Sequence, residues 1–339
     1  MTKRMIGKQV LISVLMFIVL VSFNACSPKD PAAPLSPSTA ARPSGANPTL
    51  TGRITVSGAW ALYPMMVKWA EEFQKINPGV RIDVSAGGAG KGMADALGGL
   101  ADIGMVSREV FPVEIAKGAI YVPSVIDAVV AVASAGNPLR DDLLANGINR
   151  QVFIDIWISG KITNWKEVFP GTKAVGKNAL HVFTRSDAAG APETWAAYMG
   201  QKQEDLLGIG VYGDPGLAEA VRRDPLGIGF SNIGYVYDIK TRKQVEGLLV
   251  IPIDINGNSK IDPEENFYGT LDEINKAIGT GAYPSPPARE LNLVTLREFK
   301  GATKEFVKWI LTDGQKYAPE AGYIPLSQAK VDSQLPKLK

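Results

Sequence analysis

A glycine-rich stretch, residues 85–93 (SAGGAGKGM), has the composition that points most directly to ligand chemistry. It follows an alternating run, residues 80–84, that predicts a strand, and it leads into residues that begin a helix. A glycine turn between a strand and a helix N-terminus presents backbone N–H groups, to which the helix dipole adds partial positive charge. The stretch therefore predicts an anion site, with an ordinary tight turn as the alternative.

Two well-defined phosphate-binding loops do not fit this stretch. A Walker A loop needs glycine where Ser85 stands, and a Ser or Thr for magnesium where Gly92 stands. The glycine spacing also differs from that of a dinucleotide fingerprint. The single His181 lies in an apolar strand, where we expect a core role, and no Ser or Thr has an obvious base beside it. The sequence therefore favours a binding protein over an enzyme.

Three strand-to-helix loops are expected to meet at one edge of a sheet. Strands predicted at residues 53–56, 80–84 and 102–106 alternate with helical spacing, which is typical of a parallel α/β sheet. Ligands of such sheets bind outside the carboxyl ends of the strands. A fourth loop, residues 185–191 (RSDAAGA), follows another predicted strand and contains a possible bidentate anion donor, Arg185.

Residues 254–265 (DINGNSKIDPEE) match the ligand spacing of an EF-hand calcium loop. The predicted ligands are Asp254, Asn256, Asn258, the Lys260 carbonyl, Asp262 and Glu265. Ser259 replaces the usual glycine, and no clear helix precedes the loop. A structural Ca²⁺ ion is therefore one interpretation, and a polar Asn/Asp turn is the other; we predict no required cofactor.

Composition narrows the class of protein further. The chain has 339 residues, a net charge of +2, one Cys and one His. These values give no indication of nucleic-acid binding, and they exclude a Cys/His zinc site or a disulfide within one chain. We expect a monomer with one large or two medium domains.

The N-terminus is predicted to be a lipoprotein signal peptide, residues 1–26. Basic Lys3, Arg4 and Lys8 precede an apolar run at 10–21 that is short for a membrane span, and Cys26 follows in a lipobox-like position. A plain signal peptide with an incidental Cys is the alternative. Residues 27–51 are rich in Pro, Ala, Ser and Thr and are predicted to be a disordered tether. The protein would then be exported and lipid-anchored at a bacterial membrane, facing the periplasm or exterior.

The order of these segments resembles the PstS family, the periplasmic phosphate-binding proteins of the high-affinity phosphate ABC transporter. The resemblance runs through residues 52–328, in the motifs at residues 58–64, 68–73, 87–93, 102–108, 160–165, 185–191, 226–230, 308–316 and 321–326. It implies a type II periplasmic-binding-protein fold: α/β, two lobes, each a mostly parallel sheet flanked by helices, joined by two crossing strands. The implied protein hands phosphate to a membrane permease.

The expected lobes follow from this resemblance together with the apolar strands. We predict lobe 1 at 52–130 and 248–339, with the calcium-like loop in its second part, and lobe 2 at 131–247. The long apolar strands near 128–133 and 248–253 are expected to be the crossings.

The resemblance also implies a ligand site, in which several positions depart from the family. The implied ligand-binding residues are Ala59, Trp60, Ala89, Gly90, Ser107, Arg108, Arg185, Asp187, Ala189, Gly190 and Ala191. Family members usually line the first, second and fourth loops with Ser and Thr, which are alanines or Trp60 here. Ser107 stands where the family usually has an acidic residue, Asp187 fits its Arg-paired carboxylate, and Lys91 and Arg108 would add positive charge.

Four functions are left open. Phosphate import is favoured, followed by the same fold binding another oxyanion or a small organic anion. A surface or sensor protein without transport, and an enzyme, are less favoured. Trp60 would suit a larger or less charged ligand, although a packing role explains it as well.

Overall fold

The computed structural model describes residues 50–170 and 179–338. The predicted signal peptide, Cys26 and all but the last two residues of the tether lie outside the described residues. These described residues belong to one compact unit. Within the described ranges, no helix is long and apolar enough to cross a membrane.

The strands form one extended, mixed sheet. Along the sheet their order is β2-β1-β3-β9-β4-β7-β5-β6, and β8 and β10 each pair with β4. Pairs among β1, β2 and β3, and among β5, β6 and β7, are parallel, whereas β4 and β9 run antiparallel to their neighbours. The strands are β1 (Thr51–Gly58), β2 (Gly79–Ala86), β3 (Ile103–Val106), β4 (Ala119–Ser134), β5 (His181–Arg185), β6 (Ile209–Val211), β7 (Gly227–Asn232), β8 (Leu248–Val250), β9 (Ala288–Leu296) and β10 (Ile324–Pro325).

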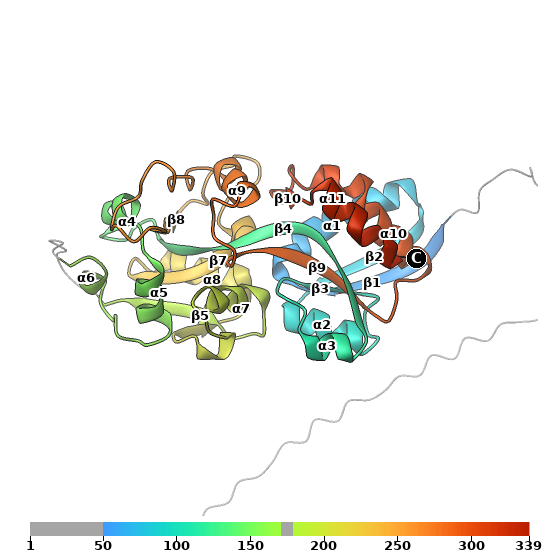
Figure 1. The fold of residues 1–339 in the computed structure, drawn as a ribbon, viewed down its shortest axis with the longest axis horizontal. Coiled ribbons are helices and arrows are strands. Elements are labelled where there is room, and N and C mark those ends of the chain that lie inside the picture. Colours follow the sequence, from blue (N-terminus) through green and yellow to red (C-terminus); the bar gives the residue numbers. More distant parts are fainter. Residues whose placement is uncertain (1–49, 171–178, 339) are drawn as a thin grey trace, which may run out of the picture. The chain divides into compact units, whose positions relative to one another are not determined.

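Helices cover this sheet (Figure 1). The α-helices are α1 (Tyr63–Ile76), α2 (Ala89–Leu97), α3 (Pro112–Ala116), α4 (Arg140–Asn146), α5 (Arg150–Trp157), α6 (Trp165–Val168), α7 (Gly190–Tyr198), α8 (Gly213–Arg223), α9 (Leu271–Thr280), α10 (Gly301–Leu311) and α11 (Gln328–Gln334). Short 3₁₀ turns are η1 (Trp60–Leu62), η2 (Gln203–Asp205), η3 (Ile233–Tyr235), η4 (Asp313–Tyr317) and η5 (Leu335–Leu338). The α/β fold predicted from the sequence is confirmed.

Helix α1 illustrates how the apolar spacing forms these elements. Met66, Trp69 and Phe73 recur on one face and are buried, which packs the helix against the sheet. Pro64 occupies the first turn, where a missing N–H costs nothing. The helix ends at Ile76, and its C-cap Asn77 is not helical because the residue before a proline disfavours helical geometry.

The apolar side chains form two separate cores. The first core surrounds Ile54, Trp69 and Phe306, and the second core surrounds Phe153, Trp195 and Phe230. The first core joins β1–β3 with α1 and α10, and the second joins β7 with α5 and α7. Two cores in one compact unit agree with the two lobes that the family resemblance implies.

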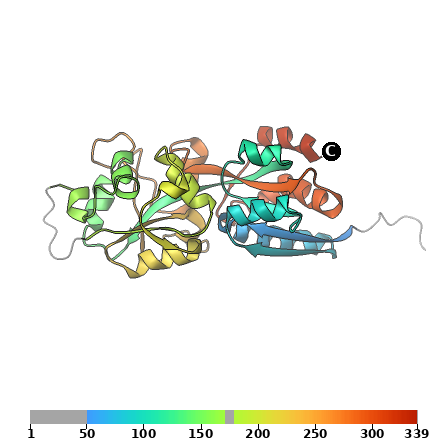
Figure 2. The same cartoon turned by 90° about the horizontal axis from the view of Figure 1, so that it is seen from below.

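The crossing strands are β4 and β9, which run side by side between the two cores in both views (Figures 1 and 2). Strand β4 contributes Val125 to the first core and Val129 to the second, so the crossing predicted near 128–133 belongs to it. The second crossing predicted at 248–253 is wrong: these residues lie wholly in the second core, where β8 pairs with the end of β4. The hydrophobicity of a short apolar run does not distinguish a central strand within one lobe from a strand that crosses between the lobes.

The lobe boundaries change accordingly. The buried apolar residues between Leu248 and Ile278 belong to the second core, and they include Tyr268 and Leu271. The predicted assignment of this segment to lobe 1 therefore does not hold, and the calcium-like loop at 254–265 lies beside the second core. Strand β9 returns the chain to the first core, with Ala288 in the second core and Leu291 in the first.

Candidate functional site

The loops that the sequence predicts at one sheet edge meet in the structure. Gly90, in the first turn of α2, donates its N–H to the Ala188 carbonyl at 3.0 Å. A Cβ added to Gly190, at the start of α7, would lie 2.1 Å from the Ser107 carbonyl oxygen and from its hydroxyl. The second, third and fourth loops are therefore in direct contact, and these contacts lie at the N-terminal ends of α2 and α7. The first N–H groups of a helix have no partner within it, so this place favours an anion.

The glycines of residues 85–93 have more than one role. Gly88 has φ 92°, a backbone conformation that glycine adopts without strain, and it precedes α2 directly. Gly92 packs against the backbone of β1 and β3, because a Cβ there would lie 2.5 Å from the Met105 carbonyl oxygen. The helix begins at Ala89, several residues earlier than the sequence pattern indicates.

Arg185 ends β5 and is the central charge of this region. Its side chain is fully buried, and its Nε and Nη2 donate to the Asp187 carboxylate at 2.8 and 2.6 Å. Its Nη1 donates to Asp214, at the start of α8, at 2.7 Å. Burial lowers the pKa of Arg185, but the charges of Asp214 and Asp187 outweigh it and hold that pKa above its usual value. The predicted Arg–Asp pair is present, with a second carboxylate that sequence reasoning missed.

The alanine positions lie at the site without side-chain donors. Ala59, Ala89, Ala189 and Ala191 are all buried. The Ala59 N–H donates to the Met105 carbonyl at 2.9 Å, and the Ala189 N–H to the Gln203 side chain at 3.1 Å. These two backbone donors are engaged with protein, as is the Gly90 N–H in the first turn of α2.

Trp60 connects the first loop to the opposite core. Its ring packs edge-on against Tyr212, with ring centroids 6.1 Å apart, and Gly213 lies against the same ring. The Tyr235 hydroxyl donates to the Trp60 carbonyl at 2.9 Å. Trp60 therefore links the first loop to the segments around the second core, and its buried Nε1 has no hydrogen-bond partner among the described residues.

Two cations predicted to add charge to the site are neutralised elsewhere. Arg108 makes a bidentate pair with Glu114, at 2.9 and 2.7 Å, and its guanidinium lies 4.3 Å from the centre of the Phe111 ring. Lys91 pairs with Asp95 and donates to the Ser57 hydroxyl at 2.9 Å. Neither is therefore available as a free positive charge for a ligand.

Two grooves open onto this region. One, of about 580 Å³, is lined by residues that include Gly90, Arg185, Ala189 and Gln203. The other, of about 550 Å³, is lined by Arg289, Asn292 and Thr194 among others. Arg108 and Glu193 line both grooves. Residues of β5, β9, α2 and α7 thus surround space that a small ligand can reach.

A second pair of buried charges, Asp127 and Arg289, lies where the crossing strands pair with each other. They are direct register partners on β4 and β9, with Arg289 Nη2 3.8 Å from the Asp127 carboxylate. Burial raises the pKa of Asp127 to about 7, against the lowering effect of Arg289. Sequence reasoning missed both residues, although an Asp at the start of a long apolar run was a signal.

The calcium-like loop has the turns that its sequence predicts. Asp254 accepts three backbone N–H groups, from Gly257, Asn258 and Ser259, at 2.8–3.1 Å. Glu265 accepts from the N–H groups of Ile255 and Asn256. Asp262 instead accepts from the side-chain amides of Asn256 and Asn258. Across residues 50–170 and 179–338, no group of three or more His, Cys, Asp or Glu is arranged to hold a metal ion.

His181 differs from its predicted core role. Its side chain is 43% exposed, and its Nδ1 lies 2.6 Å from an Asp224 carboxylate oxygen. The outer end of β5 is open to solvent at this point, so an apolar strand there does not imply a buried imidazole.

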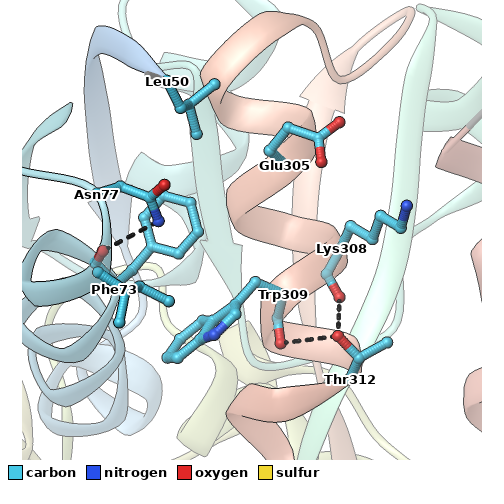
Figure 3. Close-up of a pocket in the computed structure, with 8 residues that line it drawn as sticks. Leu50, Phe73, Asn77, Glu305, Lys308, Trp309 and Thr312 are labelled. Atoms are coloured by element: carbon cyan, nitrogen blue, oxygen red, sulfur yellow. Dashed lines mark hydrogen bonds between the residues drawn. The ribbon is translucent and has the colours of Figure 1, made fainter. Parts of the chain in front are cut away.

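A further hollow, of about 340 Å³, lies between α1 and α10 (Figure 3). Phe73 and Trp309 line its floor, and the Thr312 hydroxyl donates to the carbonyls of Lys308 and Trp309. None of the predicted site residues lines this hollow. It belongs to the surface of the first core.

Comparison with known proteins defines the class. The sequence model of the PBP superfamily domain matches residues 43–313. The chain therefore belongs to the PBP, or periplasmic-binding-protein, superfamily, and the two cores joined by β4 and β9 are its fold.

Within the superfamily, the chain is most informatively compared with PstS proteins. It is 28% identical over 283 residues to the phosphate-binding protein PstS of Bacillus subtilis, with 83% of each chain covered. It is 26% identical to PstS of Methanocaldococcus jannaschii, with 81% of this chain and 82% of the relative covered. The chain is thus similar to PstS proteins over about four fifths of its length, in agreement with the resemblance of its motifs.

Solved structures agree on the fold. An ABC-type phosphate transport receptor from Vibrio cholerae matches with a TM-score of 0.57 and 23% identity, covering 80% of this chain and all of that one. A candidate phosphate ABC transporter substrate-binding protein from Clostridium perfringens, with bound phosphate, matches with a TM-score of 0.65 and 22% identity, covering 81% and 100%.

Proposed function

We propose that this protein is the substrate-binding component of an ABC importer, that it binds phosphate between the two cores, and that it delivers phosphate to a membrane permease. The single observation that carries this proposal is the position of Arg185, which is buried and lines one groove together with Gly90 of α2 and Ala189, the residue before α7. A guanidinium and two helix N-termini beside one groove are suited to a tetrahedral oxyanion. The PstS relatives support phosphate as the first ligand to test.

Binding would depend on backbone groups more than in a hydroxyl-lined site. Ala59, Ala89, Ala189 and Ala191 offer no side-chain donor, and each hydrogen bond to a charged ligand contributes about 1.5–3 kcal/mol. The Gly90 N–H of α2 already donates to the Ala188 carbonyl, so the other first-turn N–H groups of α2 and those of α7 would be the donors. We therefore expect phosphate to bind, with lower affinity than a site with the same backbone and added hydroxyls.

A second candidate function is the binding of another oxyanion or a small organic anion by the same cleft. The observation that favours it is the pairing of Arg185 with two carboxylates, Asp187 and Asp214, which leaves this cluster with a net negative charge. Such a cluster disfavours multiply charged anions. A surface or sensor protein without transport would follow if no small anion binds.

Titration calorimetry on the purified, ligand-free protein tests the proposal. Phosphate, sulfate and a set of small carboxylates are titrated separately at neutral pH. Phosphate binding with no heat from sulfate supports phosphate import, and binding of a carboxylate alone supports the second candidate. Silence from every anion would contradict both.

The lipid anchor is proposed separately, for Cys26. The predicted lipobox would place a diacylglyceryl-modified cysteine at the mature N-terminus, with residues 27–49 as the connection to the folded unit. Detergent phase partitioning of the exported protein tests it. The unaltered chain is expected in the detergent phase and Cys26→Ser in the aqueous phase; identical partitioning of both would refute the anchor.

A further inference from the structure

Trp60 makes contacts between the two lobes, that is, between the parts of the chain that surround the first and the second core. Its ring lies edge-on to Tyr212, with 6.1 Å between the ring centroids, and it packs against Gly213 at the start of α8. The Tyr235 hydroxyl donates to the Trp60 carbonyl at 2.9 Å. Trp60 follows β1 of the first lobe, whereas its three partners lie between β6 and β8 of the second lobe.

The backbone on both sides of Trp60 is held on the first lobe. The Ala59 N–H donates to the Met105 carbonyl of β3 at 2.9 Å, and the Tyr323 hydroxyl donates to the Ala61 carbonyl at 2.7 Å. Ala59 and Ala61 are themselves buried in the first core. The Trp60 side chain therefore extends to the second lobe from a backbone that is fixed to the first.

The surface of the second lobe that contacts the indole is fixed as well. The Gly213 N–H donates to the Asp187 carboxylate at 3.2 Å, and the next residue, Asp214, pairs with Arg185 at 2.7 Å. Gly213 has φ 73°, a left-handed conformation that glycine adopts without strain. A Cβ there would lie 3.4 Å from Trp60 Cε2, so the ring already lies close to the helix backbone. The start of α8 is thus a firm surface for the indole.

The contacts of Trp60 join protein groups to each other, so they need no anion to form. An edge-on aromatic pair and a neutral hydrogen bond each shift an equilibrium between two states about two- to tenfold. Both contacts are made only while the lobes touch, because each has one partner in each lobe. They therefore favour the arrangement with touching lobes over one in which the lobes are apart.

We propose that Trp60 is a latch between the lobes, which keeps the cleft predominantly closed even when no ligand is bound. The lobes would separate by bending of the crossing strands β4 and β9, which connect them. Because the Arg185 side chain is fully buried while the lobes touch, a ligand would reach it only after the latch opens. The latch does not depend on which anion binds, so it goes beyond the proposed function and can be tested apart from it.

Distances between spin labels on the two lobes test the latch in purified, ligand-free protein. One label is attached at Ala116→Cys, on α3, and the other at Lys202→Cys, and both positions are exposed. They lie near Phe111 and Gln203, which line the 580 Å³ groove from the first and the second lobe. Cys26→Ser removes the native thiol. Pulsed electron paramagnetic resonance then gives the populations of short and long distances between the labels.

We expect one predominant short distance in the labelled protein that keeps Trp60 and Tyr212. Trp60→Ala should raise the ratio of long to short distances about tenfold or more, because both contacts are lost or weakened. Tyr212→Ala leaves the first loop unaltered and should raise the ratio about twofold or more. Ile209→Ala is the control: it removes a side chain of the same lobe that is 59% exposed, against 60% for Tyr212, and should change nothing.

Two results would overturn the latch. One is a predominantly long distance in the labelled protein that keeps both aromatic residues. The other is the same distribution of distances in that protein, in Trp60→Ala and in Tyr212→Ala. Because the measurement needs no ligand, its result holds whether or not the protein binds phosphate, and a failure of the proposed function is seen separately in the calorimetric titration.

Discussion

At the scale of single residues, the net charge of the site depends on the carboxylates that pair with the Arg185 guanidinium. Arg185 has Asp187 and Asp214 as partners, and all three side chains are nearly or fully buried. Asp187 holds the guanidinium through two parallel hydrogen bonds, which fixes its plane. Asp214 adds negative charge through one hydrogen bond, so it competes most directly with an incoming anion.

Asp214→Asn is therefore expected to tighten phosphate binding. The amide oxygen of Asn still accepts from Arg185 Nη1, while the buried negative charge is removed, which should raise affinity about tenfold or more. Calorimetric titration measures the change, with Glu219→Gln, in an exposed pair on α8, as the control. Unchanged or weaker binding by Asp214→Asn would show that Asp214 does not oppose the ligand.

Asp127 should make stability depend on pH. Its pKa is about 7 in the folded protein and lies near 4 when the chain is unfolded, so the folded state binds the extra proton between these values. The free energy of unfolding should then fall by about 1.4 kcal/mol per pH unit as the pH rises from about 4 to about 7, and the effect should level off above that.

Urea unfolding at about pH 5 and about pH 7.5 measures this slope. Unaltered protein should lose about 2–3 kcal/mol more than Asp127→Asn over this interval. Arg289 and Asp214 remain in both proteins, so the difference isolates Asp127. Equal slopes in the two proteins would mean that the Asp127 carboxylate titrates in its ordinary range.

At the scale of elements, the close approach of loops depends on residues without side chains. Gly190 packs against Ser107 with no room for a methyl group. Gly190→Ala is expected to push the third and fourth loops apart and to weaken ligand binding about tenfold or more. Calorimetric titration with phosphate compares this variant with Gly279→Ala. Gly279 is a helical glycine of α9, and its added Cβ would make an ordinary 3.7 Å contact. Equal affinities for the two variants would contradict the close fit.

The loop at residues 254–265 remains a predicted calcium site. Its carboxylates already bind backbone N–H groups, so the loop can keep its turns without an ion. If Ca²⁺ binds to this loop, and its free concentration is about a hundred times the dissociation constant, removal of Ca²⁺ by a chelator should lower the melting temperature by about 3–8 °C. Asp254→Asn should lose this response, while Asp83→Asn should keep it. No chelator effect on the unaltered protein would leave the loop as a polar turn.

At the scale of the whole molecule, the sequence predicted the strands and helices whose hydrophobic residues recur at a regular period. Period-two and period-3.6 patterns located β1, α1 and β2, and parallel strands placed Gly90 and Ser107 at one edge. The motifs of the PstS family placed Arg185 and Asp187 correctly as a pair. Such patterns are sufficient to predict elements whose structure depends mainly on residues close together in the sequence.

The parts that the sequence did not predict depend on pairing between distant segments. Strand β9 was missed as a crossing because Arg289 and Glu290 interrupt its apolar pattern, and these polar residues lie where β9 pairs with β4. Asp214 reaches Arg185 from another element, 29 residues away. Arg108 was predicted to be a ligand charge because its type fits, but a contact with Glu114 satisfies it.

The most direct test of the account is the titration of ligand-free protein with phosphate and then with sulfate at neutral pH. We predict that phosphate binds and that sulfate gives no heat, since Arg185 and the helix N-termini favour an anion, while the net negative charge of Arg185 with Asp187 and Asp214 disfavours an anion that carries no proton. Binding of sulfate as tight as that of phosphate, or no binding of either, would contradict it.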